Sequence, residues 1–129
     1  MRTIEWKKGV VVTVDQSKLP NRLVHLRLRN CQEVASVIKE MKIRGAPLLG
    51  VAAAYGLALT AYHSKAKRKE GLMKEIGHSA QILKGTRPTA VNLFWAVDRI
   101  MRKAYEASGD TKTVANVIVV EAHKIADED

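Results

Sequence analysis

The chain has 129 residues, of which 47% are apolar and 27% are charged, as in an ordinary globular protein with one modest core. The 22 Lys and Arg exceed the 13 Asp and Glu, and the net charge of +9 favours nucleic acid, an acidic protein surface or a phosphorylated metabolite as partner. Cys31 is the single cysteine, which excludes an internal disulfide and indicates a reducing, cytoplasmic setting.

The segment up to Leu28 is predicted to form three strands. Alternating residues 3–6 lead through a turn ending at Gly9 into residues 10–14, which predicts a hairpin. Residues 15–20 are expected to be a loop, and residues 23–28 alternate again as a third strand. The N-terminus lacks the apolar run of a signal peptide.

A first helix is predicted from Asn30 to residues 43–45. Asn30 with Glu33 resembles a capping box, and Gly45 permits the backbone to reverse. The residues expected on its apolar face are Val34, Val37, Ile38 and Met41.

A second helix is predicted over residues 47–62. Pro47 suits a first helical position, and Ala46, which precedes it, is pushed away from helical geometry. The run is apolar on nearly every side, rich in Gly and Ala, and shorter than the roughly 20 residues of a membrane span. It therefore predicts a buried central helix that neighbouring backbones approach closely.

Residues 63–71 form a basic connector. No aromatic or base-reading pattern accompanies its charges, so a solvated loop or helix start is favoured over a nucleic-acid contact.

Three further helices are predicted beyond this connector. One closes at Gly85, the next opens at residues 86–88 and ends before residues 108–110, and the last starts at Thr111 or Thr113. Their expected buried positions are Leu72, Ile76, Ala80 and Leu83, then Leu93, Val97, Ile100 and Ala104, then Val114, Val117, Ile118 and Ile125. The expected fold class is α+β, with a small N-terminal antiparallel sheet of three strands followed by a bundle of five helices, as one domain over residues 1–129.

Two segments, 44–47 and 86–89, each place an arginine before a proline at a predicted helix start. A helix N-terminus offers unpaired N–H groups and part of a positive charge, and a guanidinium adds a fork of donors that fits phosphate. We therefore predict a phosphorylated small molecule held from two sides by Arg44 and Arg87. The alternative for each arginine is pairing with a local carboxylate.

Other chemistry is not evident in the sequence. Cys31 is expected to be a small buried side chain instead of a nucleophile, and Asp98 a surface carboxylate paired with a lysine. Asn92 and Trp95 are candidates to line a pocket, although core or interface packing is an equal alternative for Trp95. No metal-ligand spacing connects the histidines, which are His25, His63, His78 and His123.

The segments at 44–47, 50–56 and 86–96, with the opening 3–6, Asp15-Gln16 and Leu19-Pro20, resemble the S-methyl-5-thioribose-1-phosphate isomerase family. The resemblance covers residues 2–129. The family belongs to a broader group with ribose-1,5-bisphosphate isomerases and regulatory subunits of translation initiation factor 2B. The continuation at residues 92–95 and the opening favour the methylthioribose branch.

The resemblance implies an aldose–ketose isomerisation in methionine salvage, from 5-methylthioribose 1-phosphate to 5-methylthioribulose 1-phosphate, with no metal or organic cofactor. Arg44, Gly45 and Ala46 match one substrate-binding segment of the family, and Arg87 matches a second substrate-binding arginine.

The family's catalytic cysteine and aspartate lie in a larger C-terminal Rossmann-like domain, which this chain does not reach, and Cys31 does not match that cysteine. The resemblance thus implies one wall of a site, inactive alone, with a C-terminal domain or companion chain as partner and a homodimer for the full-length form. A membrane partner is not expected. A regulatory or interaction module and, more remotely, a nucleic-acid binder stay open as alternatives.

Overall fold

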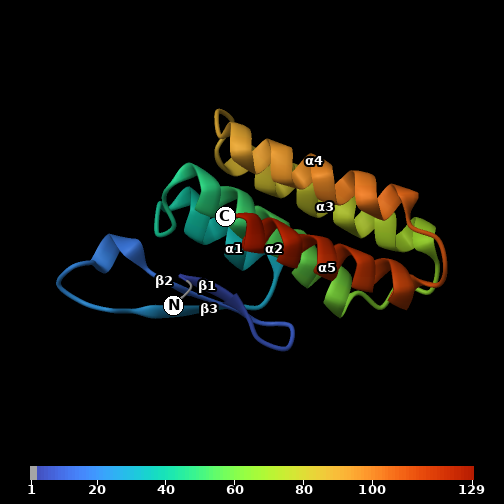
Figure 1. The fold of residues 1–129 in the computed structure, drawn as a ribbon, viewed down its shortest axis with the longest axis horizontal. Coiled ribbons are helices and arrows are strands. Elements are labelled where there is room, and N and C mark those ends of the chain that lie inside the picture. Colours follow the sequence, from blue (N-terminus) through green and yellow to red (C-terminus); the bar gives the residue numbers. More distant parts are fainter. Residues whose placement is uncertain (1–2) are drawn as a thin grey trace.

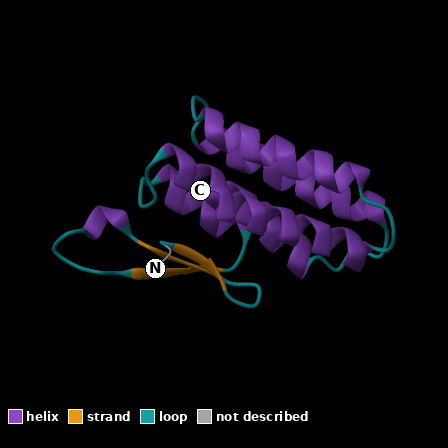
Figure 2. Ribbon diagram, viewed as in Figure 1, coloured by secondary structure: helices purple, strands orange, loops and turns teal. Residues whose placement is uncertain are grey.

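A computed structural model describes residues 3–129 (Figures 1 and 2). A three-stranded antiparallel sheet of order β1-β2-β3 precedes the helices, which confirms the predicted α+β class. The elements are β1 (Ile4–Trp6), β2 (Val11–Val14), the short 3-10 helix η1 (Gln16–Lys18), β3 (His25–Leu28), α1 (Cys31–Lys39), α2 (Ala46–His63), α3 (Lys69–Thr86), α4 (Val91–Glu106) and α5 (Thr111–Glu128).

The sheet packs one face on the helices. Val11 pairs with Trp6 on one side and with Leu28 on the other, and this row is turned toward the core. Lys8 and Gly9, with φ angles of 50° and 80°, form the two-residue turn between β1 and β2. Such positive φ values match the twist of paired strands, and this explains why glycine ends the turn.

Helix α2 lies at the centre of the bundle and contacts each of the other helices. Small residues let its neighbours come close: a Cβ built on Gly56 would lie 3.2 Å from a methyl carbon of Leu83 on α3. The prediction of a buried central helix is confirmed. None of the helices within residues 3–129 is long and apolar enough to cross a membrane.

Helix α1 ends earlier than predicted, at Lys39. The amides of Met41 and Lys42 donate to the carbonyls of Ile38 and Val37, and Met41 takes a φ of 61°. This is a Schellman ending with methionine where glycine is usual, so no glycine marks the end of the helix in the sequence. Met41 is 47% exposed, and its predicted place on the apolar face is wrong.

Helices α3 and α4 also meet differently from the prediction. Helix α3 runs through Gly85 to Thr86, and α4 begins at Val91 instead of at residues 86–88. The amide of Ala90 donates to the carbonyl of Arg87 at 2.9 Å, so Pro88 occupies the second position of a turn, which proline also favours.

Helix α5 begins at Thr111, the first of the two predicted starts, because the Asp110 carboxylate accepts the amide of Thr113 at 2.8 Å. Val117, predicted to be buried, is only half-buried. The other predicted core positions of α3, α4 and α5 are buried.

Candidate functional site

The two arginine segments lie at the same end of the bundle, where α2 and α4 begin and α5 ends (Figure 1). The beginnings of α2 and α4 touch: a Cβ built on Gly50 would lie 3.1 Å from the carbonyl oxygen of Asn92. The absence of a side chain at Gly50 therefore brings two helix N-termini together, and both dipoles point their positive ends at the same region.

Neither helix start is capped by a side chain. Gly45 and Ala90 occupy the N-cap positions, and the first turns of α2 and α4 contain no acidic residue. Gly45 has a φ of 100°, which side chains of L residues disfavour, and nothing lies within 4 Å of where its Cβ would be. The amides at the start of α2 are thus left for water or a ligand.

Arg44 immediately precedes the Gly45 cap, as predicted. Arg87 is the C-cap of α3, three residues before the Ala90 cap, so the prediction that α4 opens at residues 86–88, with Arg87 at its mouth, is wrong. Arg44 is exposed and Arg87 is half-buried. Among residues 3–129, neither guanidinium has an ion pair or hydrogen bond, so the alternative of a local carboxylate partner is not realised.

A hollow of about 540 Å³ opens beside these helix starts. Its walls are mostly apolar and come from α2, α4 and the end of the chain. The lining residues are Pro47, Gly50 and Val51 of α2, Val91, Asn92 and Trp95 of α4, and Ile125, Glu128 and Asp129 at the end of the chain. The prediction that Asn92 and Trp95 line a pocket is confirmed. Trp95 is 52% exposed, so it is not a core residue.

Arg99, which the sequence analysis did not single out, holds one wall of the hollow. Its Nε donates to Glu121 at 2.6 Å, and its two terminal nitrogens donate to the oxygens of Glu128, each at 2.7 Å. These hydrogen bonds lower the pKa of Glu128 and raise the pKa of Arg99. The guanidinium also lies 5.2 Å from the ring centroid of Trp95. The negative charge of Glu128 at the rim is therefore already compensated.

The remaining candidates have structural roles. Cys31 is 1% exposed, its Sγ donates weakly to the carbonyl of Ser79 at 3.6 Å, and burial raises the pKa of its thiol. It is a buried side chain, as predicted, and not an activated nucleophile. Asp98 pairs with Lys84 at 2.6 Å, as predicted. Within residues 3–129, no three His, Cys, Asp or Glu side chains are grouped so that they could hold a metal ion.

Comparison with models of protein families shows to which family the chain belongs. The model of the Initiation factor 2 subunit family matches residues 42–129, more than half of the chain. The chain belongs to the Initiation factor 2 subunit family. Arg44 and Arg87 both lie inside the matched range.

Relatives with curated names that resemble this chain include two isomerases. The methylthioribose-1-phosphate isomerase of Crocosphaera subtropica is 41% identical over 124 residues, which is 96% of this chain and 36% of that protein. The 5-deoxyribose 1-phosphate isomerase of Moorella thermoacetica is 42% identical over 127 residues, which is 98% of this chain and 36% of that protein.

Two solved structures share the fold of this Initiation factor 2 subunit family member. The 5-methylthioribose 1-phosphate isomerase of Pyrococcus horikoshii OT3 matches 99% of the chain and 36% of its own, with a TM-score of 0.95 and 46% identity. The delta subunit of translation initiation factor eIF-2B from A. fulgidus matches 100% of the chain and 37% of its own, with a TM-score of 0.93 and 38% identity. The chain spans about a third of the length of these relatives.

Proposed function

We propose that residues 1–129 form one domain, which binds the sugar phosphate in an aldose–ketose isomerase converting 5-methylthioribose 1-phosphate to 5-methylthioribulose 1-phosphate in methionine salvage. The observation that carries the proposal is the pair of arginines without partners among residues 3–129, beside two adjoining, uncapped helix starts. Arg44, Gly45, Ala46 and Arg87 are the proposed substrate-binding residues. The isomerase names of close relatives support this reading.

The physical basis is anion binding by preorganised donors. Two guanidinium groups and the free amides after Gly45 can share the oxygens of a phosphate, since charge-assisted hydrogen bonds are about twice as strong as neutral ones. The apolar hollow beside them suits a C5 group without a hydroxyl. Both the methylthioribose phosphate and the 5-deoxyribose phosphate in the relatives' names carry such a C5 group. The substrate would therefore be oriented as well as held.

The chemical step needs groups beyond this wall. A phosphate on C1 blocks simple ring opening to an aldehyde, so the reaction requires a positioned acid and base. Among the described residues that line the hollow, the ionisable side chains are Glu128, which is bound to Arg99, and Asp129, so the wall does not present an acid and a base as two free groups. We assign the catalytic groups to a C-terminal Rossmann-like domain or a companion chain.

The 129-residue chain alone is expected to show no turnover of 5-methylthioribose 1-phosphate, because the positioned acid and base are supplied from elsewhere. The measurement is a ketose assay on protein of verified mass, with buffer as the blank. Turnover by this chain at a rate proportional to its concentration would contradict the assignment of the catalytic groups to another domain or chain.

Substrate binding directly tests the proposed phosphate clamp, which consists of Arg44 and Arg87. Titration of the chain with 5-methylthioribose 1-phosphate is expected to give weak, saturable binding. Arg44→Ala and Arg87→Ala should each weaken it by about 10- to 150-fold, since a charge-assisted hydrogen bond contributes about 1.5–3 kcal/mol. Arg102→Ala is the matched control, because Arg102 is exposed on α4 away from the helix starts, and it should leave the Kd unchanged. If all three variants have the Kd of the unmodified chain, the two arginines do not bind the substrate.

A regulatory module is the second candidate, favoured by the TM-score of 0.93 with the delta subunit. Such a module need not bind phosphosugars. Binding of 5-methylthioribose 1-phosphate that depends on Arg44 would decide for the isomerase.

A further inference from the structure

A second hollow, of about 690 Å³, lies at the opposite end of the bundle, where α2 ends and α5 begins. We call it the α2–α5 groove. It is lined by Tyr62 of α2 and by Lys112, Thr113, Ala115, Asn116 and Val119 of α5. The substrate wall proposed above uses none of these residues.

The floor of the groove is apolar and fixed in place. Tyr62 is 50% exposed, yet its ring meets Trp6 edge-on at 5.5 Å and His63 edge-on at 5.0 Å. The turn between β1 and β2 rests on the same ring, since a Cβ on Gly9 would clash with Tyr62, and the carbonyl of Gly9 lies 2.8 Å from Nε2 of His63. Together with Ala115 and Val119, the ring offers a preformed apolar surface.

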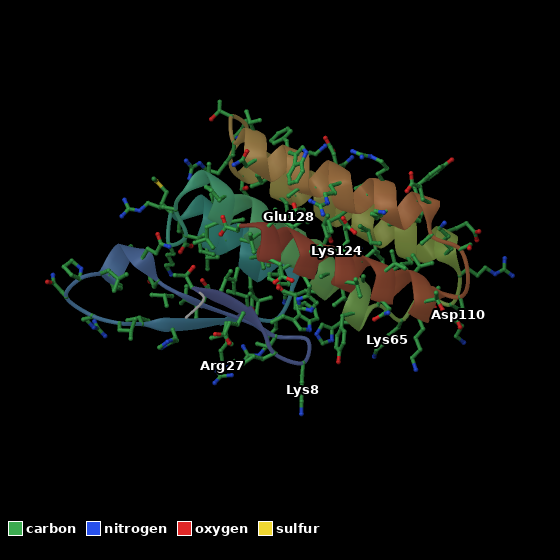
Figure 3. The ribbon with its side chains drawn as sticks, in the orientation of Figure 1. Lys8, Arg27, Lys65, Asp110, Lys124 and Glu128 are labelled. Carbon is green, nitrogen blue, oxygen red and sulfur yellow. The ribbon has the colours of Figure 1, made fainter. Side chains whose placement is uncertain are left out.

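The surroundings of this floor carry an excess of positive charge. The basic connector joins α2 to α3 directly after Tyr62, and Lys69 donates to the carbonyls of Tyr105 and Ala107, which ties the connector to the loop before α5. Lys8 and Lys65 extend away from the ribbon in Figure 3. Lys112 lines the groove, and the turn and the connector that flank Tyr62 carry Lys7, Lys8, Lys65, Lys67 and Arg68.

The acidic groups of these segments are partly engaged. Glu5 lies 3.9 Å from Lys7, and the carboxylate of Asp110 is occupied in capping α5. Glu75 accepts a hydrogen bond from Ser64 of the connector, and Glu70 and Glu106 lie at the start of α3 and the end of α4. The positive charge is therefore only partly balanced, and its position matches the basic connector that the sequence left without a function.

We propose that the α2–α5 groove binds an acidic segment of a partner protein, with one or two apolar side chains of that segment on Tyr62, Ala115 and Val119. Charge complementarity selects acidic residues at the rim, and the apolar floor supplies the anchor. Single-stranded nucleic acid fits less well, because it needs several open aromatic faces for stacking, and Tyr62 is the one aromatic residue among the described residues that line the groove.

The test uses a short labelled peptide in which Glu pairs alternate with Leu and Phe, with binding followed by fluorescence anisotropy. The double variant Lys65→Glu/Lys112→Glu is expected to weaken binding by about tenfold or more, because two attractions become repulsions. Both residues are on the surface, and glutamate is favourable in the first turn of α5. Lys39→Glu, a charge reversal at an exposed position of α1, is the control and should leave the Kd within about twofold.

Two further probes separate the contributions. A peptide with Ser in place of Leu and Phe should bind about tenfold more weakly, since the anchor is lost. Arg44→Ala should bind the original peptide normally, so failure of the proposed isomerase function leaves this test intact. No binding by the unmodified chain, equal binding by the double variant, or tighter groove-dependent binding of a single-stranded oligonucleotide would each overturn the proposal.

Discussion

Replacing Arg99 with alanine is expected to lower the free energy of unfolding by about 3 kcal/mol, at the low end of the cost of breaking a buried ion pair. The side chain of Arg99 is only 18% exposed and that of Glu121 only 6% exposed. Alanine would leave the Glu121 carboxylate in the interior without its guanidinium. The Nζ of Lys124 lies 4.0 Å from Oε1 of Glu121 and would offset only a small part of the lost electrostatic attraction. Urea denaturation followed by circular dichroism measures the change.

Two variants make this expectation specific to the buried charge. Glu121→Gln in the Arg99→Ala background should recover at least about 1 kcal/mol, because it removes the unpaired charge. Lys84→Ala breaks the exposed pair with Asp98 and should cost less than about 1 kcal/mol. If Arg99→Ala costs no more than Lys84→Ala, the network does not stabilise the junction of α4 and α5.

The sequence predicted those parts of the fold that depend on short-range patterns. The hairpin followed from alternation around Gly9, and the buried α2 from its continuous apolar run. Helix ends were predicted less well. Met41 ends α1 in a conformation where glycine is expected, and Pro88 suited a turn as well as a helix start.

In the candidate site, too, features that depend on neighbouring residues could be predicted and contacts between distant residues could not. Arg44 and Arg87 were recognisable from their neighbours, although the place of Arg87 relative to α4 was not. The network of Arg99 was not predictable, because it joins residues 22 and 29 positions apart that meet only when α5 packs on α4. Gly50 is one of several small residues in α2, and only the fold shows that it lies against Asn92.

Gly50→Val is expected to lower the free energy of unfolding by about 1–3 kcal/mol, the usual cost of inserting carbon atoms into a well-packed contact. Its Cβ would lie 3.1 Å from the backbone carbonyl oxygen of Asn92 and 3.6 Å from the Cβ of Ala96. A carbonyl in α4 cannot rotate away as a flexible side chain can, so the starts of α2 and α4 must move apart. Thermal or urea unfolding measures the stability change.

The same variant connects packing to the proposed clamp. Separating the two helix starts should weaken binding of 5-methylthioribose 1-phosphate by more than the stability loss alone would, because Arg44 and Arg87 are carried on either side of this contact. Gly77→Val is the matched control: a Cβ on Gly77 in α3 meets nothing within 4 Å, so stability should change by less than about 0.5 kcal/mol. A folded Gly50→Val protein with an unchanged Kd would show that the clamp does not depend on the close approach of α2 and α4. Loss of binding in Gly50→Val but not in Gly77→Val would tie the function of this end of the bundle to one missing side chain.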